Sequence, residues 1–489
     1  MPDNKPNVLI IHADEHRFDT LGCYGNEDIQ TPHIDSLAAN GVTFSNCYST
    51  FPVCTPSRYS LISGLYAHQH LGWTNRSTLP SGIETFPKIL KKAGYKTACV
   101  GKMHYTPTYL DVGFEKMILS EQDGPGRFDD DYHRYLKKKG LVDFADMRDQ
   151  VGEYRSKAPP EYRESFGTDP SILDEKDYNT TWIGDRACEI MEGWEGGGNL
   201  LMVGFIKPHH PHDAPPPWSE MYDPEALSLL PGWTDECLSD DLKYSPGFFS
   251  HAKLTEQKVR KVMAQYYAAV SQIDHHVGRM VKILKHKGLY DNTLIIYTSD
   301  HGDYVGFHHM TLKSNYMYDP LIKVPLVVKY PGSEYKGKHS DELVSIVDIT
   351  ATIIDGADCF IPQNLWEVVQ PLDPEEGREA VFAEDNNGNY MVRDKKYKLL
   401  LCRHKKSQFF DLKADPNELN NLIDDPGFKE DINRCKALLF DWLVFNARSQ
   451  LHVDHDAPVI KGDNVPSRGD GHEKEMEEYL RKKMNELMS

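Results

Sequence analysis

Short runs of consecutive apolar residues recur along the chain, and polar residues follow each run directly. The runs cover residues 7–11, 97–100, 200–205 and 293–298. Uninterrupted apolar runs of this length predict strands that are buried on both faces of a parallel sheet. Residues 254–287 instead carry apolar side chains at helical spacing and stop at Gly288, which predicts one long helix over the sheet. Together these elements indicate an open α/β sheet.

The pattern changes after about residue 370. Short strand-like segments separated by turns cover residues 380–383, 390–393, 397–402 and 408–412. Such spacing predicts a small antiparallel sheet. Because 489 residues exceed what one hydrophobic core usually holds, we expect two domains, residues 1–370 and residues 371–489.

The last residues, Glu473 to Ser489, have helical periodicity. Their apolar face carries Met476, Leu480, Met484 and Leu487. We expect this face to dock on the body of the same chain, with another subunit as the alternative partner.

The polar residues that follow the four buried runs are of types that carry chemistry. They are Asp14 and Glu15 after the first run, Lys102 and His104 after the second, His209, His210 and His212 after the third, and Asp300 and His301 after the fourth. In open α/β sheets, ligands bind outside the carboxyl ends of the strands. The four clusters are therefore expected to converge on one pocket. Residues 120–180, rich in charge, Pro and Gly, predict an insertion over that pocket or a solvated excursion.

Four of these residues suggest a metal site. Asp14, Glu15, Asp300 and His301 supply hard oxygen ligands and one imidazole. Such a set suits calcium or magnesium, and manganese and zinc are also compatible with it.

Cys54 stands two residues before Pro56 and four before Arg58. Proline presets φ for a first helical position, so the free N–H groups of the first turn should point at residue 54 and favour an anion there. Arg58 adds a planar, permanently charged fork. Followed by Ser60, Ser63 and Gly64, this stretch closely resembles the signature of type I sulfatases, formylglycine-dependent enzymes of the alkaline phosphatase superfamily.

The resemblance implies a reaction and a cofactor. In the family, the cysteine is oxidised to formylglycine, whose hydrate attacks the sulfur of a sulfate ester. One cation, Ca2+ by preference, is then expected on Asp14, Glu15, residue 54, Asp300 and His301. Glu15 departs from the Asp or Gln expected at its position, so its role as a ligand stays open. The alternatives are an acid that lies behind the ligands and an ion pair to Arg17.

The resemblance also implies roles for other polar residues. Lys102 and Lys313 would bind the sulfate oxygens, and His209 would protonate the leaving alcohol. His104 would deprotonate the hydrate and later release sulfate, while Arg58 would hold the hydrate. His70, Asn75 and His212 are candidates for the substrate side of the pocket, and packing or capping is the alternative for each.

The resemblance extends over nearly the whole chain. Asp411-Leu412, Asp415-Pro-x-Glu418 and Asn421-Leu422 match the C-terminal segment of the family. The implied fold is alkaline phosphatase-like, with a large mixed, mostly parallel sheet flanked by helices and a smaller C-terminal α+β domain. The implied partners are a sulfated sugar or other small sulfate ester and a formylglycine-generating maturase, and a homo-oligomer is compatible with the chain.

Composition narrows the choice of partners. A net charge of −19 disfavours nucleic acid and anionic membranes, and it favours small sulfated substrates over long anionic chains. No run approaches the roughly 18 apolar residues that cross a bilayer. Nine scattered cysteines do not read as a disulfide framework. Residues 1–6 lack the order of a signal peptide, so we expect a cytoplasmic protein, or a periplasmic or secreted one if a signal was removed.

Two alternative functions stay open. A phosphonate monoester or phosphodiester hydrolase would use the same formylglycine, metal and fold. That group typically carries uncharged residues where this chain has Lys102 and His104, so the pair favours sulfate. The second alternative is a silent relative in which Cys54 stays unconverted and the protein only binds metal.

Overall fold

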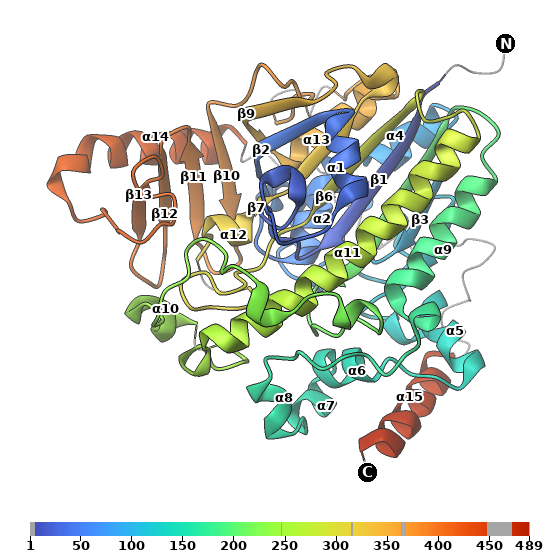
Figure 1. The fold of residues 1–489 in the computed structure, drawn as a ribbon. Helices are drawn as coiled ribbons and strands as arrows, with labels where there is room; N and C mark the ends of the chain where they lie inside the picture. Colours follow the sequence, from blue (N-terminus) through green and yellow to red (C-terminus); the bar gives the residue numbers. More distant parts are fainter. Residues whose placement is uncertain are drawn as a thin grey trace.

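The computed structural model describes residues 5–245, 247–313, 316–362, 365, 368–446 and 472–488. A nine-stranded sheet forms the centre of the molecule (Figure 1). Its strands are β1 (Asn7–Asp14), β2 (Val42–Tyr48), β3 (Lys96–Gly101), β4 (Lys116–Leu119), β5 (Asn199–Pro208), β6 (Thr293–Ser299), β7 (Lys323–Val324), β8 (Leu326–Lys329) and β9 (Lys338–Ser345). They follow the order β4-β3-β5-β1-β6-β8-β2-β7, and β9 pairs with β2.

The sheet is mixed and mostly parallel, as predicted. β1 runs parallel to β5 and β6, and β3 runs parallel to β4 and β5. β8 is antiparallel to both β6 and β2. The four predicted strands are confirmed, each within three residues of its predicted ends.

Helices cover both faces of the sheet (Figure 1). One face carries α1 (Pro32–Ala39), α9 (Asn179–Glu192) and α11 (Glu256–His286), and the other carries α2 (Cys54–Ser63), α4 (Phe86–Lys92) and α13 (Ile346–Gly356). Along β1, Leu9 and Ile11 pack in the first layer, whereas Val8 and Ile10 pack in the second. Because alternate side chains enter opposite cores, the run had to be apolar without interruption.

The smaller antiparallel sheet is also confirmed. It consists of β10 (Ala380–Glu384), β11 (Tyr390–Asp394), β12 (Tyr397–Leu401) and β13 (Gln408–Asp411), paired in that order. α14 (Lys429–Phe445) packs on β11 and β12 through Ile432, Cys435 and Leu439. The boundary at residue 370 stays a prediction.

The last helix lies elsewhere. α15 (His472–Met488) packs on α5 (Asp131–Lys139) and α6 (Phe144–Gln150), far from α14 in Figure 1. Its residues Met476, Leu480 and Met484 are buried there, which confirms docking on the same chain. Leu487 is 46% exposed, so its assignment to the docked face was wrong.

Residues 120–180 form short helices rather than a solvated excursion. Besides α5 and α6 they include α7 (Gly152–Ser156) and α8 (Pro160–Glu164). Asp130, Asp143 and Asp149 are all buried in this insertion. Three further short helices are α3 (Ala67–His70), α10 (Ser239–Tyr244) and α12 (Asp319–Ile322). Among the described residues, no helix combines the length and apolar character that a membrane span requires.

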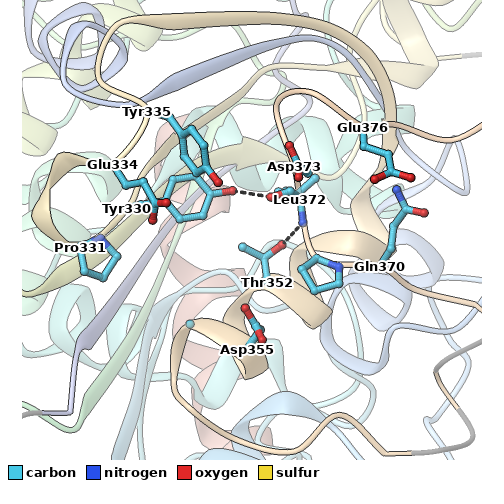
Figure 2. A pocket seen from close by; sticks show the side chains of 12 residues that line it. Tyr330, Pro331, Glu334, Tyr335, Thr352, Asp355, Gln370, Leu372, Asp373 and Glu376 are labelled. Carbon is cyan, nitrogen blue, oxygen red and sulfur yellow. Dashed lines mark hydrogen bonds between the residues drawn. The ribbon is translucent and has the colours of Figure 1, made fainter.

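A cavity of about 610 Å³ lies at the edge of the sheet opposite to the predicted pocket (Figure 2). Because β8 is antiparallel to β6, its end at Lys329, next to Tyr330, and the end of β6 at Ser299 lie at opposite edges. The Tyr330 hydroxyl donates to the Leu372 carbonyl at 2.9 Å in this cavity. Its walls carry the carboxylates of Glu334, Asp355, Asp373 and Glu376, and they include none of the predicted site residues.

Candidate active site

Cys54 is the first residue of α2, and the whole helix is buried. Pro56 therefore occupies the third helical position rather than the first, where its missing N–H still costs nothing because first-turn donors have no intrahelical acceptor. Gly64 ends the helix with φ 71°, a left-handed conformation that glycine adopts readily. The sequence predicted a free N–H group at Thr55, but in the structure this group donates to Asn75 Oδ1 at 3.1 Å. Asn75 thus caps the helix beside residue 54.

Four predicted residues meet at this helix end. Ligand atoms of Asp14, Cys54, Asp300 and His301 all lie within 4.8 Å of one another, and all four residues are buried. Cys54 Sγ is 3.6 Å from Asp14 Oδ1 and 3.3 Å from His301 Nε2. Two carboxylates and an imidazole around residue 54 are a donor set that suits a divalent cation.

Arg58 contacts both carboxylates of this group. Its Nε is 2.8 Å from Asp300 Oδ2, its Nη2 is 3.2 Å from Asp14 Oδ2, and its Nη1 donates to the Lys102 carbonyl at 2.7 Å. Burial opposes ionisation of Asp300, but Arg58 holds the pKa of this carboxyl well below its usual range. Arg58 therefore links the two carboxylates, and its expected role on the hydrate stays a prediction.

Both predicted lysines reach the group. Lys102 Nζ forms an ion pair with Asp14 and donates to Gln122 Oε1 at 2.9 Å. Lys313 Nζ lies 3.6 Å from Cys54 Sγ and 3.1 Å from His209 Nε2. Two cations therefore face the position at which a sulfate group would be attacked.

Glu15 stands apart from the four-residue group. Its Oε2 lies 3.3 Å from Lys313 Nζ and 3.2 Å from His209 Nε2. The cluster of possible ligand atoms that includes Glu15 contains His209 and His210 instead of Asp14. A backbone φ of 64° at Glu15 helps to separate its side chain from that of Asp14. The geometry thus argues against the expected metal ligand and also against the alternative pairing with Arg17, which binds Asp19.

His104 lies three residues beyond the end of β3 in a left-handed backbone conformation, with φ 55°. Glu121 holds this conformation because its Oε1 accepts the N–H groups of Met103 and His104, both at 3.0 Å. Neither ring nitrogen of His104 has a hydrogen-bond partner among the described residues. Burial and the charge of Lys102 lower the pKa of His104 well below its usual value. A neutral imidazole of this kind can accept a proton.

His209 and His210 stack with ring centroids 4.3 Å apart. Burial and Lys313 lower the pKa of His209, whose Nδ1 bonds to the His210 carbonyl at 2.6 Å. His210 Nδ1 lies 2.5 Å from Asp149 Oδ2, a residue of the insertion. Sequence patterns did not reveal Gln122, Glu121 or Asp149, because only the tertiary fold brings the charge-rich insertion to the pocket.

His70 and His212, two candidates for the substrate side of the pocket, are both buried. His70 uses both ring nitrogens inside the protein, with Ser60 Oγ at 3.1 Å and the Gly72 N–H at 3.0 Å, so its assignment to substrate is not supported. His212 is buried, and burial together with His210 lowers its pKa to about 3. The role of His212 on the substrate side stays a prediction.

Comparison with known proteins gives the family. The model described as Sulfatase matches residues 6–359, well over half of the chain. The chain belongs to the sulfatase family. This sulfatase is a sulfuric ester hydrolase of the type I group in the alkaline phosphatase superfamily. A second model, described as N-sulphoglucosamine sulphohydrolase, C-terminal, matches residues 307–442.

Relatives with named activities align with most of this chain. An arylsulfatase of Clostridium perfringens is 29% identical over 94% of this chain and 98% of its own length. An N-acetylglucosamine-6-O-sulfatase of Bacteroides thetaiotaomicron is 27% identical over 86% of this chain and 83% of its own length. The solved phosphonate monoester hydrolase from Silicibacter pomeroyi has a TM-score of 0.73 and 23% identity, covering 90% of this chain and 96% of that one. At this identity, the likeness shows the fold alone.

Proposed function

We propose that this sulfatase removes sulfate from a sulfated sugar and that residue 54, converted to formylglycine, is its nucleophile. The position of Cys54 carries the proposal, because its Sγ lies within 3.6 Å of Asp14, His301 and Lys313. Support for a sugar comes from the sugar sulfatases named by one relative and by the C-terminal family model.

A divalent cation on Asp14, Asp300 and His301 would neutralise sulfate oxygens, and Ca2+ is our choice for it. Lys102 and Lys313 would bind the same oxygens from the side of the protein. They stabilise the negative charge that develops as the S–O bond to the alcohol breaks. Arg58 keeps both carboxylate ligands ionised and in place.

Proton transfer involves two histidines. His209 would give a proton to the leaving alcohol oxygen, and because its own pKa is lowered, this proton would reach Nε2 from Lys313, 3.1 Å away. His104 would take a proton from residue 54 when sulfate leaves. The lowered pKa of His104 suits this second role, because a base must be unprotonated before it acts.

Phosphonate monoester or phosphodiester hydrolysis is the second candidate. Support for it comes from the fold that this chain shares with the hydrolase from Silicibacter pomeroyi. The ion pair between Lys102 and Asp14 favours sulfate hydrolysis, because Lys102 is a residue expected in sulfatases, whereas the rival group typically has an uncharged residue at this position. The maturase and a homo-oligomer stay predictions.

Peptide mass spectrometry on residue 54, with sulfate release measured on the same sample, tests the proposal. We expect formylglycine and sulfate release from sulfated sugars, with little turnover of a phosphodiester. Cys54→Ala should abolish turnover and leave the unfolding midpoint unchanged, whereas Cys188→Ala, at a buried cysteine in α9, should stay active. Turnover by Cys54→Ala would refute the mechanism, phosphodiester turnover alone would favour the rival, and an unconverted cysteine would indicate a silent relative. Metal analysis of the same sample identifies the cation.

A further inference from the structure

A cavity of about 520 Å³ lies where the central sheet meets the C-terminal sheet. Lys323 of β7 and Arg393 of β11 both line it, so each sheet contributes one cation. We propose that this cavity binds a tetrahedral oxyanion, namely sulfate, phosphate or the sulfate group of a larger ligand. The inference does not depend on the reaction proposed above.

The carboxylates in the wall are already neutralised. Asp19 pairs with Arg17, whose Nε is 2.6 Å from Asp19 Oδ1. Asp319 Oδ1 is 2.8 Å from Lys398 Nζ, and its Oδ2 accepts the Tyr48 hydroxyl at 2.9 Å. Each of the two carboxylates therefore already has a cationic partner within hydrogen-bonding distance.

The two cations lack such partners. Among the described residues, Lys323 forms no ion pair, and its Nζ lies 4.3 Å from the centroid of the Phe18 ring. Arg393 is 8% exposed, and its buried Nε and Nη1 have no hydrogen-bond partner in the described part of the chain. Its Nη2 has only a long contact, 3.4 Å, with Asn46 Oδ1. Unpaired buried donors of this kind are costly, and an anion would satisfy them.

The neighbouring charges point to the same class of ligand. Burial lowers the pKa of Lys323, the charge of Asp319 opposes this shift, and the repulsion from Arg393 adds to it. An oxyanion between the two side chains would relieve that repulsion. The planar guanidinium can donate two parallel N–H bonds to sulfate or phosphate, while Lys323 supplies a point charge. Ordinary neutral ligands would leave both charges unbalanced.

The cavity is distinct from the reaction site. Its lining residues include none of the groups around Cys54. Two of them, Arg17 and Phe307, nevertheless belong to the segments that carry Glu15 and Lys313. The cavity therefore adjoins two segments of the active site.

Calorimetric titration of the full chain with inorganic sulfate tests the site. We expect two binding events, one at the reaction site and one in this cavity. Arg393→Gln should weaken one event about tenfold or more, since charge-assisted hydrogen bonds are lost. The competitive inhibition of turnover by sulfate, which reports the reaction site, should not change. Lys395→Gln, an exposed lysine paired with Glu342, is the matched control and should keep both events.

Lys323→Gln provides a second variant if Arg393→Gln fails to fold, and Arg393→Lys should restore part of the affinity. A raised KM for a doubly sulfated sugar, with KM for a singly sulfated one unchanged, would identify a substrate sulfate as the ligand. Loss of the binding event without any change in KM would identify a free ion. Unchanged binding in both glutamine variants, or one event only in the unaltered protein, would overturn the inference.

Discussion

At the scale of single residues, two adjacent carboxylates serve different groups. Asp14 faces the group around Cys54, while Glu15 contacts Lys313 and His209. The sequence predicted the location of both, because polar residues after a buried strand lie at its carboxyl end. Their separation depends on the left-handed backbone at Glu15, which no periodicity encodes for a residue other than glycine.

Glu15→Gln should therefore lower sulfate release without loss of the cation. The change keeps the side-chain size but removes the charge that holds Lys313 and His209, so we expect a fall of roughly 10- to 100-fold in kcat. Metal content, measured by mass spectrometry, should match the unaltered protein. Glu27→Gln, at an exposed acid, should change neither. Loss of metal in Glu15→Gln would make Glu15 a ligand after all.

Glu121 holds His104 in place through two backbone N–H groups, and it touches no expected position of the substrate. Glu121→Ala should release the left-handed backbone of His104 and lower kcat by roughly 10- to 100-fold, with a smaller effect on KM. Glu121→Gln keeps an acceptor oxygen and should recover much of this activity. Steady-state kinetics decide the matter, because equal losses in both variants would show that charge, not positioning, is important.

At the scale of elements, the sequence predicted strands better than the loops between them. A strand that is buried on both faces appears in the sequence as a continuous apolar run, and α11 appears as apolar residues at helical spacing. The insertion has no such signature, because its buried residues are carboxylates paired with side chains from elsewhere, such as Asp149 with His210. Contacts between elements likewise leave no recognisable pattern in the sequence. Asp274 of α11 accepts the N–H groups of His33 and Ile34 and so caps α1.

This cap should make stability depend on pH. Burial raises the pKa of Asp274 to about 7, against about 3.9 for an unfolded aspartate. The folded state therefore binds an extra proton between these values, and its stabilising contribution, complete below about pH 4, is lost as pH rises towards 7. Asp274→Asn keeps an acceptor oxygen and cannot ionise.

Urea unfolding at pH 5 and pH 8 measures the effect. The unaltered protein should lose stability relative to Asp274→Asn between these two pH values. Asp291→Asn, at an exposed aspartate, should follow the unaltered protein at both. A constant difference between the unaltered protein and Asp274→Asn would show that Asp274 stays ionised in the fold.

At the scale of the whole molecule, a buried ion cluster joins the two sheets. Lys398 Nζ of β12 lies 2.8 Å from Asp319 Oδ1 and 2.8 Å from Glu418 Oε1. Glu418 belongs to the C-terminal motif recognised in the sequence, and Asp319 is the first residue of α12, which contacts β7 of the central sheet. The motif could therefore be recognised in the sequence, but the contact of Glu418 with Asp319 could not. These two residues lie 99 positions apart, and only the fold brings them together.

Lys398→Met should loosen this junction. It leaves two buried carboxylates without their cation, and breaking a buried ion pair in this way typically costs about 3–5 kcal/mol. Lys396→Met, at a lysine whose side chain is half exposed, should cost less than about 0.5 kcal/mol. If charge is the cause, Lys398→Met combined with Asp319→Asn and Glu418→Gln should recover part of the loss, because no uncompensated charge remains. Urea unfolding of the four proteins separates these cases. Equal stability of Lys398→Met and Lys396→Met would show that the cluster contributes little to holding the sheets together.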